Sequence, residues 1–299
     1  MKILITGSNG LLGQKLVSLI SGNEALQLIA TSRGENRLPT GDYVYESMDI
    51  TDSAEVDRVI SKHAPDAVIN TAAMTQVDQC ETEKEACRSL NVDAVKYMVE
   101  ACRKAGSFFL HLSTDFIFDG EDGPYDEEAE ANPLSFYGHS KLDSEALVKE
   151  SGISWAIART VLVYGTAHDM SRSNIILWVK NNLEKGNPLR VVDDQWRTPT
   201  LAEDLAQGCL LIVEKKAEGV YNISGKELLT PYDMAMKTCD FYGLDKSLVS
   251  RVNASTFSQP AKRPAKTGFI ITKAETELGY KPHSFEEGMK ILSNQLMVK

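Results

Sequence analysis

The stretch Thr6-Gly7-Ser8-Asn9-Gly10-Leu11-Leu12-Gly13 begins at the last residue of the apolar segment Lys2–Thr6. That segment reads as a strand, and Leu12–Ile20 repeats its apolar residues at helical spacing. A glycine-spaced turn between a strand and a helix lets the backbone approach a pyrophosphate, and the first amides of the helix face its charge. A tight turn that only packs the helix on a sheet is the alternative. We expect the dinucleotide contacts of this turn to come from Gly7, Asn9, Gly10, Leu11 and Leu12.

Further apolar segments alternate with helix-like stretches along the first half of the chain. The expected strands are Leu26–Thr31, Tyr43–Met48, Asp66–Thr71, Ser107–Ser113 and Ser154–Arg159. Asp52 opens a second helix with the spacing of a capping box, and Gly22 lies where the first helix should end. This alternation predicts an α/β fold, a Rossmann-like doubly wound parallel sheet with a smaller C-terminal substrate-binding region. We expect residues 1–159 to form the NAD(P)-binding domain, to which some later segments return, and 160–299 to be mainly substrate-binding.

Composition excludes several other classes of protein. The 299 residues carry a formal net charge of −10, which disfavours nucleic-acid binding but not a local phosphate site. No apolar run approaches the length of a membrane span, and the first residues already read as a strand. The five cysteines form no CxxC pair, which suggests free thiols in a reducing compartment. We therefore expect a cytoplasmic protein with no membrane or nucleic-acid partner.

The end of the second strand indicates which nicotinamide cofactor is used. A carboxylate at this position would bind the adenosine ribose and repel a 2′-phosphate, but here the chain reads Thr31-Ser32-Arg33. A hydroxyl and a guanidinium suit a 2′-phosphate. Ser32 and Arg33 therefore predict NADPH, with NADH left open as a second cofactor. An ordinary solvated arginine is the alternative for Arg33.

Two later strand ends carry further candidate cofactor contacts. Asp49 and Ile50 follow the third strand, where a carboxylate and an apolar side chain would meet the adenine; a helix cap is the alternative for Asp49. The small residues of Asn70-Thr71-Ala72-Ala73 would let the backbone lie against the cofactor. Asn91 would brace that turn, or else lie on a helix surface. The candidates in these segments are Asp49, Ile50, Thr71, Ala72, Ala73 and Asn91.

The stretch Tyr137-Gly138-His139-Ser140-Lys141 places a phenol and an ammonium four residues apart, hence on one helix face. A nearby ammonium stabilises a phenolate, so we expect Lys141 to lower the pKa of Tyr137 and suit it to proton transfer. Thr114, at the end of the fifth strand, would hold the substrate carbonyl oxygen beside Tyr137. Turn chemistry is the alternative for Thr114. His111, in an apolar strand, is interpreted as a packed residue.

These motifs together resemble those of the extended short-chain dehydrogenase/reductase superfamily, over essentially the whole chain. Residues 112–120, residues 194–200 and Arg263-Pro264 are most similar to the dTDP-4-dehydrorhamnose reductases. The resemblance implies NADPH-dependent reduction of a nucleotide-linked 4-keto sugar, as in dTDP-rhamnose biosynthesis. It implies a catalytic trio of Thr114, Tyr137 and Lys141, in which Lys141 also anchors the nicotinamide ribose. It places at the substrate Thr114, Asp115, Phe116, Arg159, Trp196 and Arg197. Simple packing is the alternative for Trp196, and pairing with Asp193 or Asp194 is the alternative for Arg197.

The chain departs from its relatives at four positions. Phe116 stands where sugar-nucleotide dehydratases have a glutamate, and Asp115 where epimerising relatives have a cysteine. Lys15 replaces an acid that some rhamnose reductases use with magnesium, so we expect no metal site. Arg197 replaces a glycine common in the reductase pattern, and the sugar is therefore not assigned to rhamnose.

Two other functions stay open. The chain resembles, more weakly, the regulatory beta subunit of methionine adenosyltransferase, which would make it a non-catalytic nucleotide-binding subunit. A sugar-nucleotide epimerase is the second alternative. The intact set of Thr114, Tyr137 and Lys141 favours a reductase. The expected partner is a nucleotide-sugar substrate, and a homodimer is left open.

Overall fold

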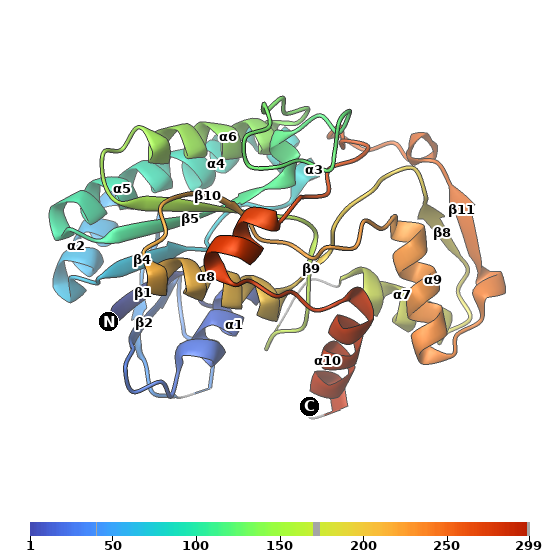
Figure 1. The fold of residues 1–299 in the computed structure, drawn as a ribbon, viewed down its shortest axis with the longest axis horizontal. Coiled ribbons are helices and arrows are strands. Elements are labelled where there is room, and N and C mark those ends of the chain that lie inside the picture. The colour runs from blue at the N-terminus through green and yellow to red at the C-terminus, as the bar shows by residue number, and fades with distance from the viewer. Residues whose placement is uncertain (40, 170–173, 298–299) are drawn as a thin grey trace.

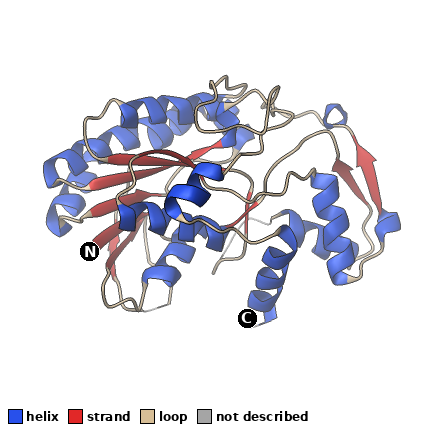
Figure 2. Ribbon diagram, viewed as in Figure 1, coloured by secondary structure: helices blue, strands red, loops and turns tan. Residues whose placement is uncertain are grey.

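Seven parallel strands form the central sheet, in the order β10-β6-β5-β4-β1-β2-β3 (Figures 1 and 2). The computed structural model describes residues 1–39, 41–169 and 174–297. The strands are β1 (Lys2–Thr6), β2 (Gln27–Ser32), β3 (Val44–Ser47), β4 (Ala67–Asn70), β5 (Phe108–Thr114), β6 (Trp155–Thr160) and β10 (Gly219–Asn222). The predicted doubly wound parallel sheet is confirmed. The strand order reverses between β1 and β4, which is where such folds bind their ligands.

Helices cover both faces of this sheet (Figure 1). Successive β1 side chains alternate between the faces: Ile3 and Ile5 join one core, and Leu4 joins the other. The first face is covered by α1 (Leu11–Ile20) and α8 (Ala202–Lys215), and the second by α2 (Ser53–His63), α5 (Ala94–Ala105) and α6 (Phe136–Lys149). The short α3 (Val77–Thr82), α4 (Lys84–Arg88) and π-helical turn η1 (Ser89–Asp93) lead into α5.

The structure confirms only some of the capping residues that the sequence predicts at the helix ends. Asp52 caps α2 by accepting from Ala54 N at 2.8 Å, as expected. The capping box is not completed, because the Glu55 carboxylate accepts from Asp49 N at 2.7 Å instead. Gly22 follows the end of α1 with φ +85°. Within the described residues, no helix is both long enough and apolar enough to cross a membrane.

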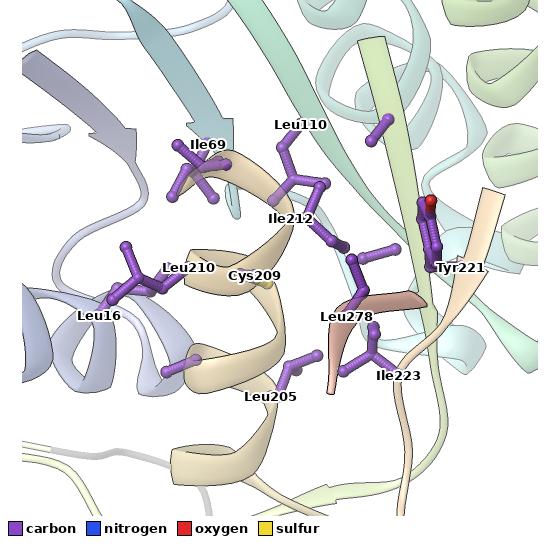
Figure 3. Packing of buried hydrophobic residues seen from close by; sticks show 14 of the residues in the cluster. Leu16, Ile69, Leu110, Leu205, Cys209, Leu210, Ile212, Tyr221, Ile223 and Leu278 are labelled. Atoms are coloured by element: carbon purple, nitrogen blue, oxygen red, sulfur yellow. The ribbon is translucent and has the colours of Figure 1, made fainter. Parts of the chain in front are cut away.

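Segments from the second half of the chain return to the sheet. Figure 3 shows α8 packed on the sheet, where Cys209 and Ile212 belong to the same buried cluster as Leu110, Ile223 and Tyr221. Helix α8 thereby fills the core that α1 begins, and β10 extends the sheet beyond β6. The sheet unit therefore includes residues well beyond position 159.

The remaining elements form a smaller region beside the carboxyl ends of the strands (Figure 1). It has its own two apolar clusters, one around Met234 and Phe285 and the other around Val179 and Ala235. Its helices and strands are β7 (Val163–Tyr164), α7 (Ile175–Leu183), β8 (Leu189–Val192), β9 (Thr200–Leu201), α9 (Pro231–Tyr242), β11 (Val249–Val252) and α10 (Phe285–Met297). Short turns complete the fold: η2 (Asp115–Ile117), η3 (Lys246–Leu248), η4 (Ala254–Thr256) and η5 (Ala274–Leu278).

Candidate active site

The glycine turn joins β1 to α1 as the sequence predicts. Gly7 has φ +68°, a conformation that glycine adopts without strain. A Cβ at position 13 would lie 2.2 Å from the carbonyl oxygen of Gly7, so only glycine lets α1 start this close to the turn. Gly10 precedes α1 without a side-chain capping bond, so no side chain covers the positive end of the helix at this residue. The turn fits a pyrophosphate; contacts from Asn9, Leu11 and Leu12 stay a prediction.

The loop after β2 carries the residues predicted to select the cofactor. Ser32 ends the strand, and the Arg33 side chain is 79% exposed, with its guanidinium 3.9 Å from a carboxylate oxygen of Asp49. Such an exposed, long contact holds a guanidinium only weakly. Asn9 donates to Glu35 O at 2.9 Å and accepts from Arg37 N at 3.0 Å. Asn9 therefore ties this loop to the glycine turn. The exposed Arg33 side chain is free to reach a phosphate.

Asp49 and Ile50 lie between β3 and α2. Asp49 accepts from the backbone and the hydroxyl of Thr51 at 2.9 and 2.7 Å, and these hydrogen bonds hold the pKa of its carboxyl below the usual range. The helix-cap alternative for Asp49 is wrong, because Asp52 is the cap. Ile50 is buried in the core under α2. Adenine contact by Asp49 and Ile50 stays a prediction.

The turn after β4 packs directly on the glycine turn. Thr71 Oγ1 donates to Thr6 O at 2.6 Å. A Cβ on Gly7 would lie 2.9 Å from that hydroxyl and 3.0 Å from the backbone of Ala72. The predicted contacts Thr71, Ala72 and Ala73 therefore follow the strand beside the switch point, next to the glycine turn.

Asn91 is buried in η1, so the helix-surface interpretation of this residue is wrong. Its Oδ1 accepts from Met74 N at 2.8 Å, and its Nδ2 donates to Met74 O and to Ser140 Oγ, both at 3.0 Å. Asn91 thus braces the segment after β4 against α6. A direct contact with the cofactor stays a prediction.

The end of β5 brings Thr114 against Tyr137. The Thr114 hydroxyl lies 3.1 Å from Asp115 Oδ1 and accepts from Phe116 N at 3.3 Å. The Phe116 and Tyr137 rings meet edge to face, with centroids 5.8 Å apart. A Cβ at Gly138 would lie 2.2 Å from Phe116 O, so this glycine lets α6 approach the strand end. The structure thus assembles the predicted hydroxyl and phenol.

The expected lowering of the Tyr137 pKa is wrong, because the pKa is raised instead. Burial raises the pKa of the phenol well above its usual value, although a hydrogen bond with Thr114 acts the other way. Lys141, one turn along α6, has its Nζ 3.1 Å from His111 Nε2. Burial also lowers the pKa of Lys141 to about 8, against the opposite influence of Glu145. Tyr137 is therefore fully protonated near neutral pH.

Arg159, predicted at the substrate, is buried on β6. Its Nε and Nη2 donate to the Glu145 carboxylate at 3.0 and 2.8 Å, and its Nη1 donates to Glu127 O at 3.1 Å. Each nitrogen of the guanidinium thus already has a protein acceptor. In this arrangement Arg159 ties β6 to α6, and a substrate contact would require breaking that ion pair.

Trp196 and Arg197 lie between β8 and β9, and Trp196 bridges to Lys266. Trp196 is partly exposed, whereas Arg197 is buried. The Arg197 guanidinium donates to Pro264 O at 2.7 Å and to Ala265 O at 3.2 Å, and it lies 3.6 Å from Asp115 Oδ2. The alternative pairing of Arg197 with Asp193 or Asp194 is wrong, since the partner is Asp115. Arg197 joins the 263–268 segment to the end of β5.

Several residues of the site are not among the predicted site residues. Arg263 makes a two-pronged ion pair with Asp78 of α3, at 3.0 and 2.7 Å. Thr267 donates to Asp115 Oδ2. These bonds hold the 263–268 segment at the carboxyl ends of the strands of the central sheet. The similarity of Arg263-Pro264 to the reductases was the one available hint.

Two buried thiols adjoin Tyr137 as well. Cys80 and Cys87 form an apolar cluster with Met74 and Tyr137. Interaction with Cys80 lowers the pKa of Cys87. All five cysteines are free, as expected.

No metal site is visible within residues 1–39, 41–169 and 174–297: no three histidines, cysteines or acids gather there as ligands. Lys15, which stands in place of a family acid, pairs with Glu203 at 2.7 Å and contacts Gln295 Oε1 at 3.0 Å. In this chain the position therefore joins α1 to α8 and α10.

Comparison of the chain with known proteins gives a consistent result. The family model described as RmlD substrate binding domain matches residues 1–298. A probable low-salt glycan biosynthesis reductase of Haloferax volcanii is 31% identical over 98% of this chain and 97% of its own length. A dTDP-4-dehydrorhamnose reductase of Aggregatibacter actinomycetemcomitans is 31% identical, with 97% of each chain covered.

Two further relatives bear on cofactor and on catalysis. The structure of a dTDP-4-dehydrorhamnose reductase from Bacillus anthracis str. Ames, in complex with NADP, superposes with a TM-score of 0.86. The two are 25% identical, and the match covers 98% of this chain and 99% of that one. Methionine adenosyltransferase 2 subunit beta of Pongo abelii is 29% identical over 92% of this chain and 82% of its own length.

Proposed function

The chain belongs to the RmlD substrate binding domain family, within the extended short-chain dehydrogenase/reductases, and on that premise we propose that it reduces a nucleotide-linked 4-keto sugar. It is an NAD(P)-dependent oxidoreductase. The observation that carries the proposal is the buried Tyr137 phenol, whose ring packs on Phe116 two residues after Thr114, at the carboxyl end of β5. A non-catalytic subunit has no use for a buried phenol and hydroxyl placed together in this way.

The chain's own residues supply binding and proton transfer. A reduced nicotinamide, when bound, supplies the hydride. The glycine turn would hold its pyrophosphate, and Ser32 with Arg33 would hold a 2′-phosphate. Thr114 would donate a hydrogen bond to the sugar carbonyl oxygen, and the Tyr137 hydroxyl would give that oxygen its proton. The raised pKa of Tyr137 keeps the phenol protonated until negative charge develops on the carbonyl oxygen.

Lys141 supports the phenol after it has given up the proton. An ammonium on the same helix face stabilises the phenolate that remains. Its lowered pKa of about 8 still leaves it charged at neutral pH. It would also bind the ribose hydroxyls of the nicotinamide side.

The first experiment is Tyr137→Phe, assayed by NADPH oxidation with a panel of nucleotide-linked keto sugars. The change keeps the ring on Phe116 and removes the proton, so turnover should fall by about a hundredfold or more. NADPH affinity and melting temperature should stay at wild-type values. Turnover within a few-fold of wild type would show that Tyr137 is not the proton donor, and no reduction of any keto sugar by the wild type would favour a regulatory subunit.

A further inference from the structure

A row of buried polar side chains crosses three neighbouring strands next to the site. Thr6 on β1 pairs in register with Asn70 on β4, and Asn70 pairs with His111 on β5. Thr6 Oγ1 donates to Asn70 Oδ1 at 2.6 Å, and Asn70 Nδ2 lies 3.1 Å from His111 Nδ1. Beyond the ring, His111 Nε2 lies 2.9 Å from Ser144 Oγ and 3.1 Å from Lys141 Nζ. The row therefore leads from the glycine turn to Lys141.

Two independent hydrogen bonds determine where His111 carries its proton. The Thr6 hydroxyl donates to Asn70 Oδ1, so the amide nitrogen faces His111 and its N–H needs Nδ1 as an acceptor. The Ser144 hydroxyl donates to Lys141 O at 2.7 Å, so its oxygen accepts from Nε2. Burial and the charge of Lys141 hold the pKa of His111 well below its usual value, so the ring is neutral. Both ends assign the single ring proton to Nε2.

In this tautomer, Nε2–H interacts differently with the ammonium and the neutral amine of Lys141. An ammonium has three donors and no lone pair, so it cannot bond to Nε2–H, whereas a neutral amine can accept from it. The other ionisable groups that act on Lys141 are Cys87 on α4 and Glu145 on its own helix, and Tyr137 lies one turn earlier on that helix. Glu145 is already paired with Arg159. The 3.1 Å contact between Lys141 Nζ and Nε2 therefore suits the neutral amine, whereas the ammonium is repelled by Nε2–H.

We propose that His111 is a positioning residue whose Nε2–H turns the Lys141 ammonium away from the sheet and toward the face of α6 that carries Tyr137. Asn70 fixes this tautomer, and Thr6 fixes the orientation of Asn70. The proposal rests on Lys141 serving the proposed reduction. His111 itself does not touch the reacting atoms, and it acts through Lys141.

The tautomer can be measured without any substrate. Nitrogen-15 NMR of the histidine rings separates a protonated from an unprotonated ring nitrogen, and the chain has five histidines. A His111→Gln variant identifies the His111 signals. We expect Nε2–H with bare Nδ1 between pH 6 and pH 9. A ring protonated on Nδ1, or on both nitrogens at pH 7, would overturn the proposal whatever the enzyme's activity.

The variant Asn70→Asp should reverse the arrangement. A carboxylate accepts from Nδ1–H, so the ring proton moves to Nδ1 and the bare Nε2 captures the Lys141 ammonium. The maximal turnover should then fall by about tenfold or more. The alkaline fall in turnover should move to higher pH by about one unit or more, because the ammonium is stabilised. Asn187→Asp, which adds the same charge at an exposed loop, should change neither property.

The outcomes separate this proposal from the proposed function. If Asn70→Asp moves the ring proton while maximal turnover stays at the wild-type level, His111 does not position Lys141. If Asn70→Asp does not fold, the wild-type tautomer still decides the matter. If the wild type reduces no keto sugar, the proposed function fails on its own, while the NMR result stands.

Discussion

Lys141 shows most clearly how the interior of this protein changes the chemistry of a residue. Its side chain is almost fully buried, and burial lowers its pKa from the usual 10.5 to about 8. Tyr137 is shifted in the opposite sense, toward a higher pKa. Burial disfavours the charged form in both cases, which is why the two shifts differ in sign. The pair is poised so that the phenol holds its proton while the ammonium is close to losing one.

This leads to a prediction for the pH dependence of turnover. A lysine with a pKa of about 8 is half deprotonated at pH 8 and neutral above it. Turnover should therefore fall as the pH rises through about 8, well before an ordinary lysine or tyrosine would titrate. A pH profile of kcat from pH 6 to pH 10 checks this, with melting temperature measured at each pH as the control. A kcat that is flat to pH 9.5 would contradict the assigned role of Lys141.

Arg33 is the residue on which cofactor preference should depend. Its guanidinium is exposed, and its contact with Asp49 is long. A charge-assisted bond to a 2′-phosphate contributes about 1.5–3 kcal/mol, which corresponds to roughly a ten- to hundredfold preference. Arg33→Ala should remove most of the preference for NADPH and leave the Kd for NADH unchanged.

Titration of both cofactors against wild type and variant measures this preference. Arg88→Ala, at an exposed arginine of α4, is the matched control and should behave as wild type. Equal binding of NADPH and NADH by the wild type would make Arg33 an ordinary surface residue.

At the scale of elements, the distance between α6 and the end of β5 determines where Tyr137 lies relative to Thr114. Helix α6 starts with Ser135 as its cap, whose hydroxyl accepts from Gly138 N at 3.2 Å. Gly138 then faces the carbonyl oxygen of Phe116, so close that no side chain fits between them. The phenol on the preceding residue reaches Thr114 only because α6 comes this near.

Gly138→Ala should therefore separate the two elements. The added Cβ would lie 2.2 Å from a backbone oxygen, which cannot move aside as a flexible side chain can. Overpacking of this kind costs about 1–3 kcal/mol of stability. A displacement of Tyr137 of about 1 Å would reduce kcat by about a hundredfold.

Denaturation and steady-state kinetics of Gly138→Ala measure both effects. His139→Ala, at the exposed neighbour on the same helix, controls for the alanine substitution and should leave kcat intact. Wild-type kcat in Gly138→Ala would show that the approach of α6 does not position Tyr137.

At the scale of the whole molecule, the buried ion pair Arg197–Asp115 and the partly exposed pair Arg263–Asp78 join segments from the two halves of the chain. Arg197 and Thr267 both reach Asp115, directly after the strand that carries Thr114. Arg263 reaches Asp78 from the same segment. Burial raises the pKa of Asp115, and Arg197 and Thr267 partly offset this. The position of the 263–268 segment thus depends on contacts between residues far apart in sequence.

The variant Arg197→Lys tests the contacts of Arg197 with Asp115 and the 263–268 segment. One ammonium cannot serve the carbonyls of Pro264 and Ala265 and the Asp115 carboxylate in the planar arrangement of a guanidinium. Buried carbonyls would lose their donors, at about 1–3 kcal/mol each. We expect a lower melting temperature together with a higher KM for the nucleotide sugar, because the 263–268 segment loosens, and an unchanged Kd for NADPH. Arg190→Lys, at an exposed arginine of β8, is the control; an unchanged KM beside a lowered melting temperature would restrict Arg197 to a structural role.

The sequence by itself determined the features that depend on neighbours along the chain. The strand–glycine turn–helix unit, the alternation of strands and helices, and the four-residue spacing of Tyr137 and Lys141 are local patterns, and each is found where the sequence indicates. Only the tertiary structure decided how far side chains are removed from water and which distant groups they meet. That is why the pKa of Tyr137 rises instead of falling, and why Arg159 pairs with Glu145 and Arg197 with Asp115. It is also why Asn91 proves to be buried. Burial and long-range pairing are properties of the packed molecule, because they join residues that no local pattern relates.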